Sequence, residues 1–137
     1  MKIIQSTILF TAISLASFVS SVKADDDTSF GAKQYVDNNC VACHQAGGTG
    51  VPGSYPALKG APVVSGDQDT LIKLILLGPE KVLPANSPKF PAPMPPVPKM
   101  SDAKIAALLT YIRATFGNGA APVTEDEVAK VRASLAQ

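Results

Sequence analysis

The sequence predicts an all-α protein of four to five short helices joined by long loops. Amphipathic or capped stretches indicate helices over residues 27–36, 71–77 and 102–116, and a fourth begins after Thr124. Segments rich in glycine and proline separate them, and no run alternates as a half-buried β-strand does. At 137 residues, with 46% hydrophobic and 17% charged residues, the chain has the composition of one globular domain.

The first 24 residues have the pattern of an export signal. Lys2 precedes an uncharged stretch over residues 3–22, and small residues at Val22 and Ala24 occupy the usual cleavage offsets. We expect a cleaved signal peptide over residues 1–24 and a mature periplasmic domain over residues 25–137. A retained membrane anchor is the alternative, although polar residues interrupt the stretch. The mature domain has ten basic and eleven acidic residues, so no nucleic-acid partner is implied.

The helix predicted over residues 27–36 leads into the motif Cys40-Val41-Ala42-Cys43-His44. At this spacing two thiols one helical turn apart can both reach the vinyl carbons of one porphyrin edge, and the adjacent imidazole is directed at the iron. We therefore expect one haem c, covalently attached through Cys40 and Cys43, with His44 as an iron ligand.

Other uses of a cysteine pair fit this sequence less well. A thioredoxin-like pair requires a βαβ setting in which a helix begins at the first cysteine, whereas here a helix precedes it. Structural zinc needs about four Cys or His ligands, and the chain has two cysteines and one histidine. A disulfide across so short a loop would add little stability.

The segment from Gln45 to Gly60 is rich in glycine and proline, which predicts a loop that approaches a flat cofactor closely. It lacks the preceding strand and the Gly-Lys-Ser/Thr ending of a phosphate-binding loop. The next apolar run, over residues 71–77, follows Asp69 and stops at Gly78. Acidic residues at the start and a glycine after the end are typical of a short buried helix.

The single histidine limits the choice of a second axial ligand. With no other imidazole in the chain, a methionine, another weak ligand or an open site remains. Met94 lies in the proline-dense segment Pro84 to Pro98, whose fixed φ angles pre-order an extended loop. Met100 directly precedes Ser101, where an apolar residue before a helix N-cap ordinarily packs in the core. We expect Met94 as the ligand and Met100 as a packing residue.

Two helices complete the prediction. Ser101 caps the helix over residues 102–116, whose apolar positions share one face and which ends at Gly117. Thr124 and Glu127 form a capping box that opens a final amphipathic helix. Three apolar residues of this last helix are expected to pack on the body: Val128, Val131 and Leu135.

From about Phe30 to Phe116 the chain resembles class I c-type cytochromes. The resemblance implies the cytochrome c fold, with loops wrapped around one haem. It also implies that Gly31 and Tyr35 meet Leu108 and Tyr111 where two helices cross closely, since glycine in a helix is costly unless close packing requires it.

Two further segments carry the resemblance. Pro56-Ala57-Leu58-Lys59-Gly60 resembles the family's loop in which the proline carbonyl accepts a hydrogen bond from the ligating histidine, which implies that Pro56 faces His44; Pro52 is a weaker candidate. Met94-Pro95-Pro96-Val97 is similar to cytochrome subunits that serve periplasmic alcohol, sugar or gluconate dehydrogenases. In those subunits the methionine before proline is the axial ligand, and many carry three haem sites where this chain has one.

The resemblance implies an electron carrier rather than an enzyme, with a dehydrogenase, an oxidase or another cytochrome as redox partner. Membrane contact is expected only through partners or an uncleaved anchor. Four lysines between residues 70 and 101 would steer a partner, although ordinary surface charge also explains them: Lys73, Lys81, Lys89 and Lys99. The alternative function is a haem enzyme or gas-binding sensor in which Met94 is displaced and the iron has an open site.

Overall fold

The structure is a computed structural model that describes residues 19–136, with side chains from residue 28 onward. Within this range there are six α-helices and one 3₁₀ helix, and the only extended pairing is an isolated bridge between Val51 and Tyr55. The all-α class is therefore confirmed. Residues 1–18 of the predicted signal peptide lie outside the described residues. No helix of the described range has the length and apolar character needed to span a membrane.

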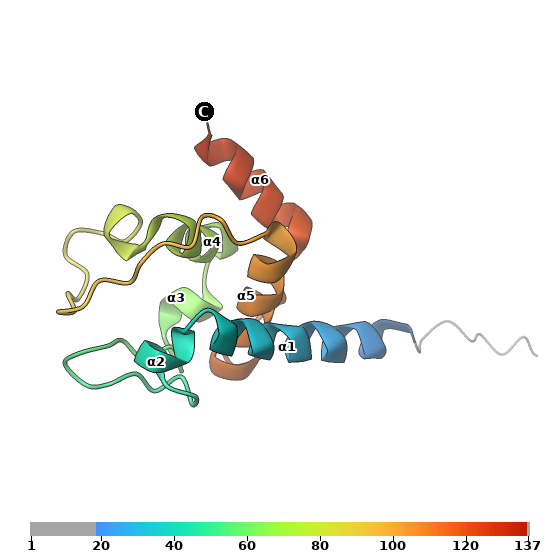
Figure 1. Ribbon diagram of the computed structural model, residues 1–137, viewed down its shortest axis with the longest axis horizontal. Helices are drawn as coiled ribbons and strands as arrows, with labels where there is room; N and C mark the ends of the chain where they lie inside the picture. The colour runs from blue at the N-terminus through green and yellow to red at the C-terminus, as the bar shows by residue number, and fades with distance from the viewer. Residues whose placement is uncertain (1–18, 137) are drawn as a thin grey trace, which may run out of the picture.

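The elements follow one another in the order α1 (Val19–Asp37), α2 (Cys40–His44), α3 (Pro62–Ser65), α4 (Gln68–Leu77), η1 (Pro79–Lys81), α5 (Asp102–Phe116) and α6 (Glu125–Leu135) (Figure 1). The four helices expected from periodicity and caps are α1, α4, α5 and α6, and α2 carries the cysteine motif. The additional helix is α3, which the sequence analysis did not predict. Its four residues are too few to show a helical period, although Pro62 stands at a first-turn position that proline favours.

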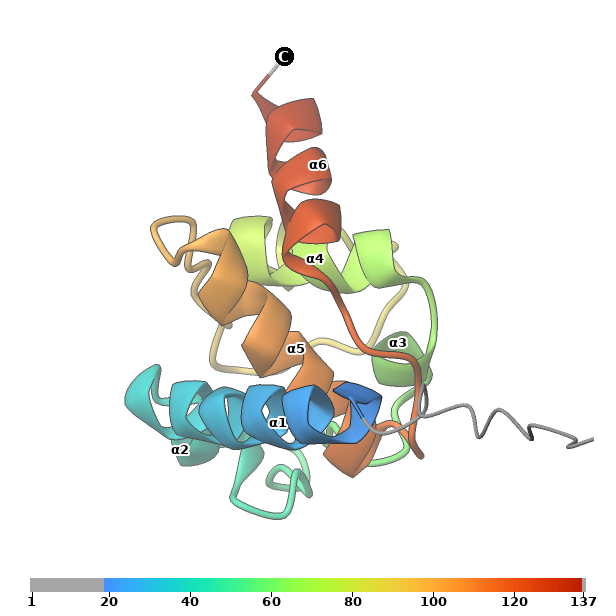
Figure 2. The same ribbon diagram turned by 90° about the vertical axis from the view of Figure 1, so that its right-hand side faces the viewer.

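The most extensive helix contact is the crossing of α1 with α5, which Figure 2 shows side by side. A Cβ atom at Gly31 would lie 2.6 Å from the Cβ of Tyr111 and would overlap the carbonyl of Ala107. Only glycine allows this approach, as the resemblance implied. The nearest neighbours of a Cβ at Gly31 are Ala107 and Tyr111, and the side chain of Leu108 is fully buried in the core.

The final helix α6 packs on α4 and α5 (Figure 2). Its capping box is present: the Thr124 amide donates to Glu127 Oε2 at 2.7 Å, and the Glu127 amide donates to Thr124 Oγ1 at 3.3 Å. Val128 and Val131 are buried as predicted. The prediction was wrong for Leu135, which is 39% exposed. It lies on the last turn, which projects beyond the other helices in Figure 1.

The segment between α5 and α6 is held by a buried cation. Arg113 is 4% exposed, and its Nε donates to Ala121 O at 2.6 Å. Its Nη1 donates to Val64 O at 2.8 Å and to Gly66 O at 3.0 Å. The planar guanidinium thus joins α5 to two other chain segments through three carbonyls, and its buried N–H groups are satisfied. Periodicity marks residue 113 only as part of a helix and does not reveal this role.

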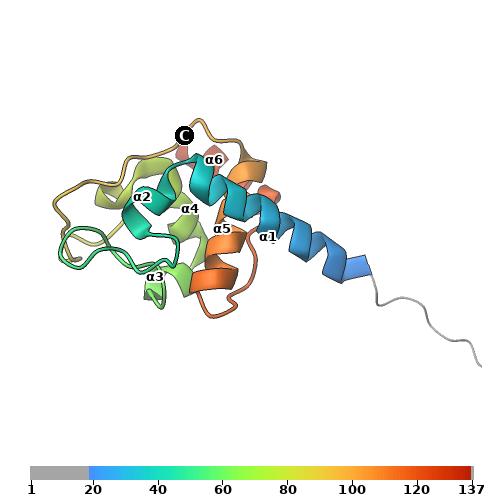
Figure 3. The ribbon, with the colours of Figure 1, turned by 60° about the horizontal axis from the view of Figure 1, so that its bottom comes forward.

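Two long loops extend to the same side of the α1–α5 pair, as Figures 1 and 3 show. One, over residues 45–60, follows α2; the other, over residues 82–101, joins η1 to α5. The fold therefore places the cysteine–histidine motif and the Met94 segment on one side of the molecule, although about fifty residues separate them in sequence.

Candidate haem-binding site

The motif occupies α2, a helix of five residues whose direction is set by its two ends. Asn39 before it has φ +61°, and Gln45 after it has φ +64°. Positive φ is a backbone conformation that residues with side chains rarely adopt, and it makes the chain turn sharply on either side of the helix. The Tyr35 hydroxyl donates to Gln45 O at 2.8 Å, which ties the end of α2 to α1. The orientation of the motif is thus set by α1.

Cys40 and Cys43 stand three positions apart on this helix, so both sulfur atoms lie on one side of it. Both residues are half-buried, and they are not joined in a disulfide. Burial raises the pKa of the Cys40 thiol, a hydrogen bond from the Cys40 backbone lowers it, and the electrostatic interaction with Cys43 raises it slightly further. In the polypeptide, Cys40 is therefore a neutral thiol near pH 7.

His44 is 8% exposed, and its Nδ1 lies 2.9 Å from the carbonyl oxygen of Pro56. A carbonyl oxygen only accepts hydrogen bonds, so Nδ1 carries the proton and donates it to this bond. In the neutral imidazole the other ring nitrogen, Nε2, then has the lone pair, which is the form that binds a metal. The contact implied by the resemblance is present, and its acceptor is Pro56 rather than Pro52.

The backbone of Gly50 supports this contact. Its amide donates to His44 O at 2.9 Å, and a Cβ at this position would lie 2.6 Å from the carbonyl carbon and oxygen of Pro56. Its φ is +61°, in the region that favours glycine. Gly50 therefore allows the Pro56 carbonyl to reach His44. The sequence predicts a glycine-rich loop here but does not single out Gly50, because composition does not tell which glycine meets another backbone.

Three aromatic rings from α1 and α5 form a cluster next to the motif. The centroids of Tyr35, Tyr111 and Phe116 are 5.6 to 5.7 Å apart in each pair. Burial raises the pKa of Tyr35, and the neighbouring Cys40 and Tyr111 add to the effect, so its hydroxyl stays protonated and donates to Gln45 O. The end of the 45–60 loop is bonded to one residue of this aromatic cluster, because the Gly60 amide donates to Phe116 O at 2.9 Å.

The two methionines differ in their surroundings. Met100 is 9% exposed and packs in the hydrophobic core. Met94 is half-buried at the edge of that core. The helix after Met100 starts at the predicted residue, but Ser101 makes no side-chain cap hydrogen bond.

The Met94 segment is fastened to α4. The Val97 amide donates to Ile75 O at 2.8 Å. A Cβ at Gly78, which has φ +81°, would lie 3.3 Å from the carbonyl oxygen of Met94. The end of α4 therefore lies directly against the backbone of the predicted ligand.

The described residues fit a haem in their ligand atoms and in the apolar side chains around them. Two thiols and an imidazole with a free Nε2 come from one short helix, and a thioether comes from the loop on the same side. Half-buried apolar side chains at the edge of the core provide contacts for a large apolar ring: Leu58, Leu77, Val82, Leu83 and Val97.

Comparison with known proteins identifies the family. The Cytochrome c family matches residues 29–116. The chain is 34% identical over 112 residues to cytochrome c-552 of Thermus thermophilus, which covers 75% of this chain and 84% of that protein.

Cytochrome subunits of dehydrogenases are similar as well. The cytochrome c subunit of the quinone alcohol dehydrogenase of Gluconobacter oxydans is 33% identical over 104 residues, covering 74% of this chain and 22% of the subunit. The gluconate 2-dehydrogenase cytochrome c subunit of Pantoea cypripedii is 34% identical over 112 residues, covering 78% and 25%. This chain therefore spans about a quarter or less of those subunits. With the match to most of its length, the chain belongs to the cytochrome c family, whose domains bind haem c covalently and act as electron carriers.

Proposed function

We propose that this protein is an exported carrier of single electrons, with one haem c attached through Cys40 and Cys43 and with His44 and Met94 as axial ligands of its iron. The observation that carries the proposal is the hydrogen bond from His44 Nδ1 to Pro56 O. It fixes the tautomer of a buried imidazole so that Nε2 is available, directly beside two thiols.

The residues of the chain would hold the group and keep its sixth position closed. When bound, the haem iron alternates between Fe(III) and Fe(II) and so takes up and returns one electron. The Pro56 carbonyl orients His44, and the contacts of Val97 and Gly78 keep the Met94 segment against α4. With a thioether in the sixth position no site is left for a substrate, which favours electron transfer over catalysis.

We further propose that residues 1–24 are a cleaved signal peptide and that residues 25–137 work in the periplasm. The charged start, the uncharged stretch and the small residues before Asp25 support this. The family match begins at residue 29, shortly after the proposed cleavage point.

The proposed partners are redox proteins: a dehydrogenase, an oxidase or another cytochrome. Several relatives are named as cytochrome subunits of dehydrogenases, which supports a donor of that kind. Lys81, Lys89 and Lys99 are exposed around the Met94 segment and Lys73 is half-buried on α4. These lysines would attract an acidic partner surface, and that association would weaken with salt.

Absorption spectra of the purified holoprotein test the proposal. The ferric protein should be low-spin with the weak methionine-to-iron band near the red end of the spectrum. The ferrous spectrum should not change when carbon monoxide is added, because Met94 holds the sixth position. Ready binding of carbon monoxide by the wild-type protein would favour the haem enzyme or gas sensor instead.

A further inference from the structure

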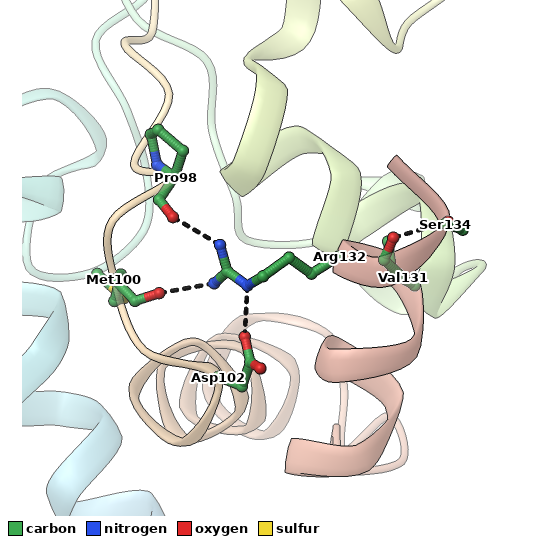
Figure 4. Close-up of polar contacts among 6 residues, drawn as sticks. All are labelled: Pro98, Met100, Asp102, Val131, Arg132 and Ser134. Atoms are coloured by element: carbon green, nitrogen blue, oxygen red, sulfur yellow. Dashed lines mark hydrogen bonds and ion pairs between the residues drawn. The ribbon is translucent and has the colours of Figure 1, made fainter. Parts of the chain in front are cut away.

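The side chain of Arg132 on α6 reaches the segment that joins Met94 to α5 (Figure 4). Its Nη1 donates to Pro98 O at 2.6 Å and its Nη2 donates to Met100 O at 2.7 Å. Its Nε donates to Asp102 Oδ1 at 2.7 Å. One guanidinium thus binds two carbonyls of the segment and the first residue of α5.

The segment depends on bonds of this kind because it has few amide donors of its own. Five prolines between residues 90 and 99 lack the backbone N–H: Pro91, Pro93, Pro95, Pro96 and Pro98. The Val97 amide ties the segment to Ile75 O on α4. Arg132 holds it from α6 through carbonyls, which prolines retain.

Arg132 is itself well anchored. Its neighbour Val131 is 2% exposed and Val128, one turn earlier, is fully buried. The chain that enters α6 is tied to α5, since Thr110 Oγ1 donates to Val123 O at 3.1 Å and accepts from the Val123 amide at 3.0 Å. The arginine side chain is 34% exposed, so its charge is partly hydrated, while Nε, Nη1 and Nη2 each donate a hydrogen bond.

We infer that Arg132 is a positioning residue for Met94, through which α6 holds the ligand segment on α5 and keeps Met94 in place against competing ligands. The inference rests on the axial ligation proposed above. The family match ends at residue 116, so α6 and this arginine lie outside the matched part of the chain.

Imidazole binding to the full-length ferric holoprotein tests the inference, because imidazole must displace Met94 to reach the iron. Arg132→Gln should raise the apparent affinity for imidazole about tenfold, since hydrogen bonds from a charged donor are lost. Arg132→Lys keeps the charge but not the planar fork, and should give a smaller increase of about threefold. Hydrogen exchange of the Val97 and Met100 amides should become faster in both variants, independently of any spectrum.

Two controls separate positioning from general effects. Lys130→Ala removes an exposed cation from the same helix, and Ile72→Val trims a fully buried residue of α4 and lowers global stability. Both should stay within about twofold of the wild-type affinity for imidazole.

An unchanged affinity in folded Arg132→Gln would overturn the inference, and so would an equal increase in Ile72→Val, which would assign the effect to stability alone. A wild-type protein without the methionine band would overturn the proposed ligation together with the inference. A wild-type protein with the band and an unresponsive Arg132→Gln variant would overturn the inference only.

Discussion

The carbonyl oxygen of Pro56 decides which nitrogen of His44 is left for a metal, and the missing side chain of Gly50 decides whether that carbonyl can reach the imidazole. Neither residue supplies a reactive group. At the scale of single residues, the site therefore depends on backbone atoms and on a position where no Cβ fits.

Leucine substitutions distinguish the two methionines, because leucine keeps the volume and removes the sulfur. Met94→Leu should abolish the methionine-to-iron band and allow carbon monoxide to bind the ferrous protein. Met100→Leu should retain the band and change the free energy of unfolding by less than about 1.5 kcal/mol. Visible spectra and urea unfolding measure both. A band that survives in Met94→Leu and disappears in Met100→Leu would reverse the assignment.

Alanine at Gly50 should destabilise the protein more than alanine at Gly53. Both glycines have positive φ, at +61° and +75°. No atom lies within 4 Å of a Cβ at Gly53, so only the backbone cost of about 1 kcal/mol is expected there. At Gly50 the Cβ would overlap the Pro56 carbonyl, which should cost about 1–3 kcal/mol more. Urea unfolding of the holoproteins measures the difference, and equal losses would show that the loop relaxes without cost.

At the scale of elements, side chains that are local in sequence cap the starts of α4 and α6. Thr124 and Glu127 close a capping box on α6, and Asp67 caps α4 by accepting from the Thr70 amide at 2.8 Å and from Thr70 Oγ1 at 2.6 Å. The Thr70 hydroxyl and then its amide lower the pKa of Asp67, with smaller contributions from Lys73 and Arg113. Such bonds are local in sequence, so a sequence pattern can reveal them.

The cap at Asp67 predicts a pH-dependent contribution to stability. Because the folded pKa is below its ordinary value of 3.8, the contribution is present above about pH 4 and is lost as the pH falls through the folded pKa. Asp67→Ala should therefore be less stable than the wild type at pH 7, and the gap should close in acid. Thermal unfolding at pH 7 and at about pH 3 measures it. Asp69→Ala, in the same turn, should show a smaller gap; a gap at Asp67 independent of pH would contradict the prediction.

At the scale of the whole molecule, the crossing of α1 and α5 joins the early and late parts of the chain. α1 holds the end of α2 through the hydrogen bond from the Tyr35 hydroxyl to Gln45 O, and α5 holds the 45–60 loop through the Phe116 carbonyl. The rings of Tyr35 and Phe116 contact each other between the two helices. The last helix, α6, packs on α5 and α4 and reaches the Met94 segment through Arg132 (Figure 2). The two sides of the candidate site are thus supported by different helices.

Alanine at Gly31 tests this crossing. Its Cβ would overlap the Ala107 carbonyl and the Tyr111 side chain, so the helices would have to separate, at a cost of about 3 kcal/mol or more. Gly47→Ala is the control, since its nearest neighbour is Thr49 Cγ2 at 3.7 Å and its expected effect is within about 0.5 kcal/mol. Chemical unfolding of both holoproteins measures the costs. A small effect at Gly31 would show that the close crossing is not needed for stability.

Patterns that are local in sequence determined much of what could be predicted. The four longer helices follow from periodicity and caps, and the five residues of the cysteine–histidine motif are enough to indicate haem attachment. The role of Pro56 came from the resemblance to a family, whereas Met94 was already indicated by the single histidine and the proline-dense loop. The helix α3 was not predicted because four residues show no helical period. The prediction that Leu135 packs on the body was wrong because its helix extends past the neighbouring helices.

By itself the sequence determined the all-α class, the bounds of α5, the capping box of α6 and the cysteine–histidine motif, because each depends on residues within a few positions of one another. The tertiary structure alone decided that Gly50 makes room for Pro56, that Arg113 joins three carbonyls, and that Arg132 reaches across to Pro98 and Met100. Those contacts join backbone atoms of segments far apart in the chain. No residue type at either end specifies the partner, so only the packing of the helices brings them together.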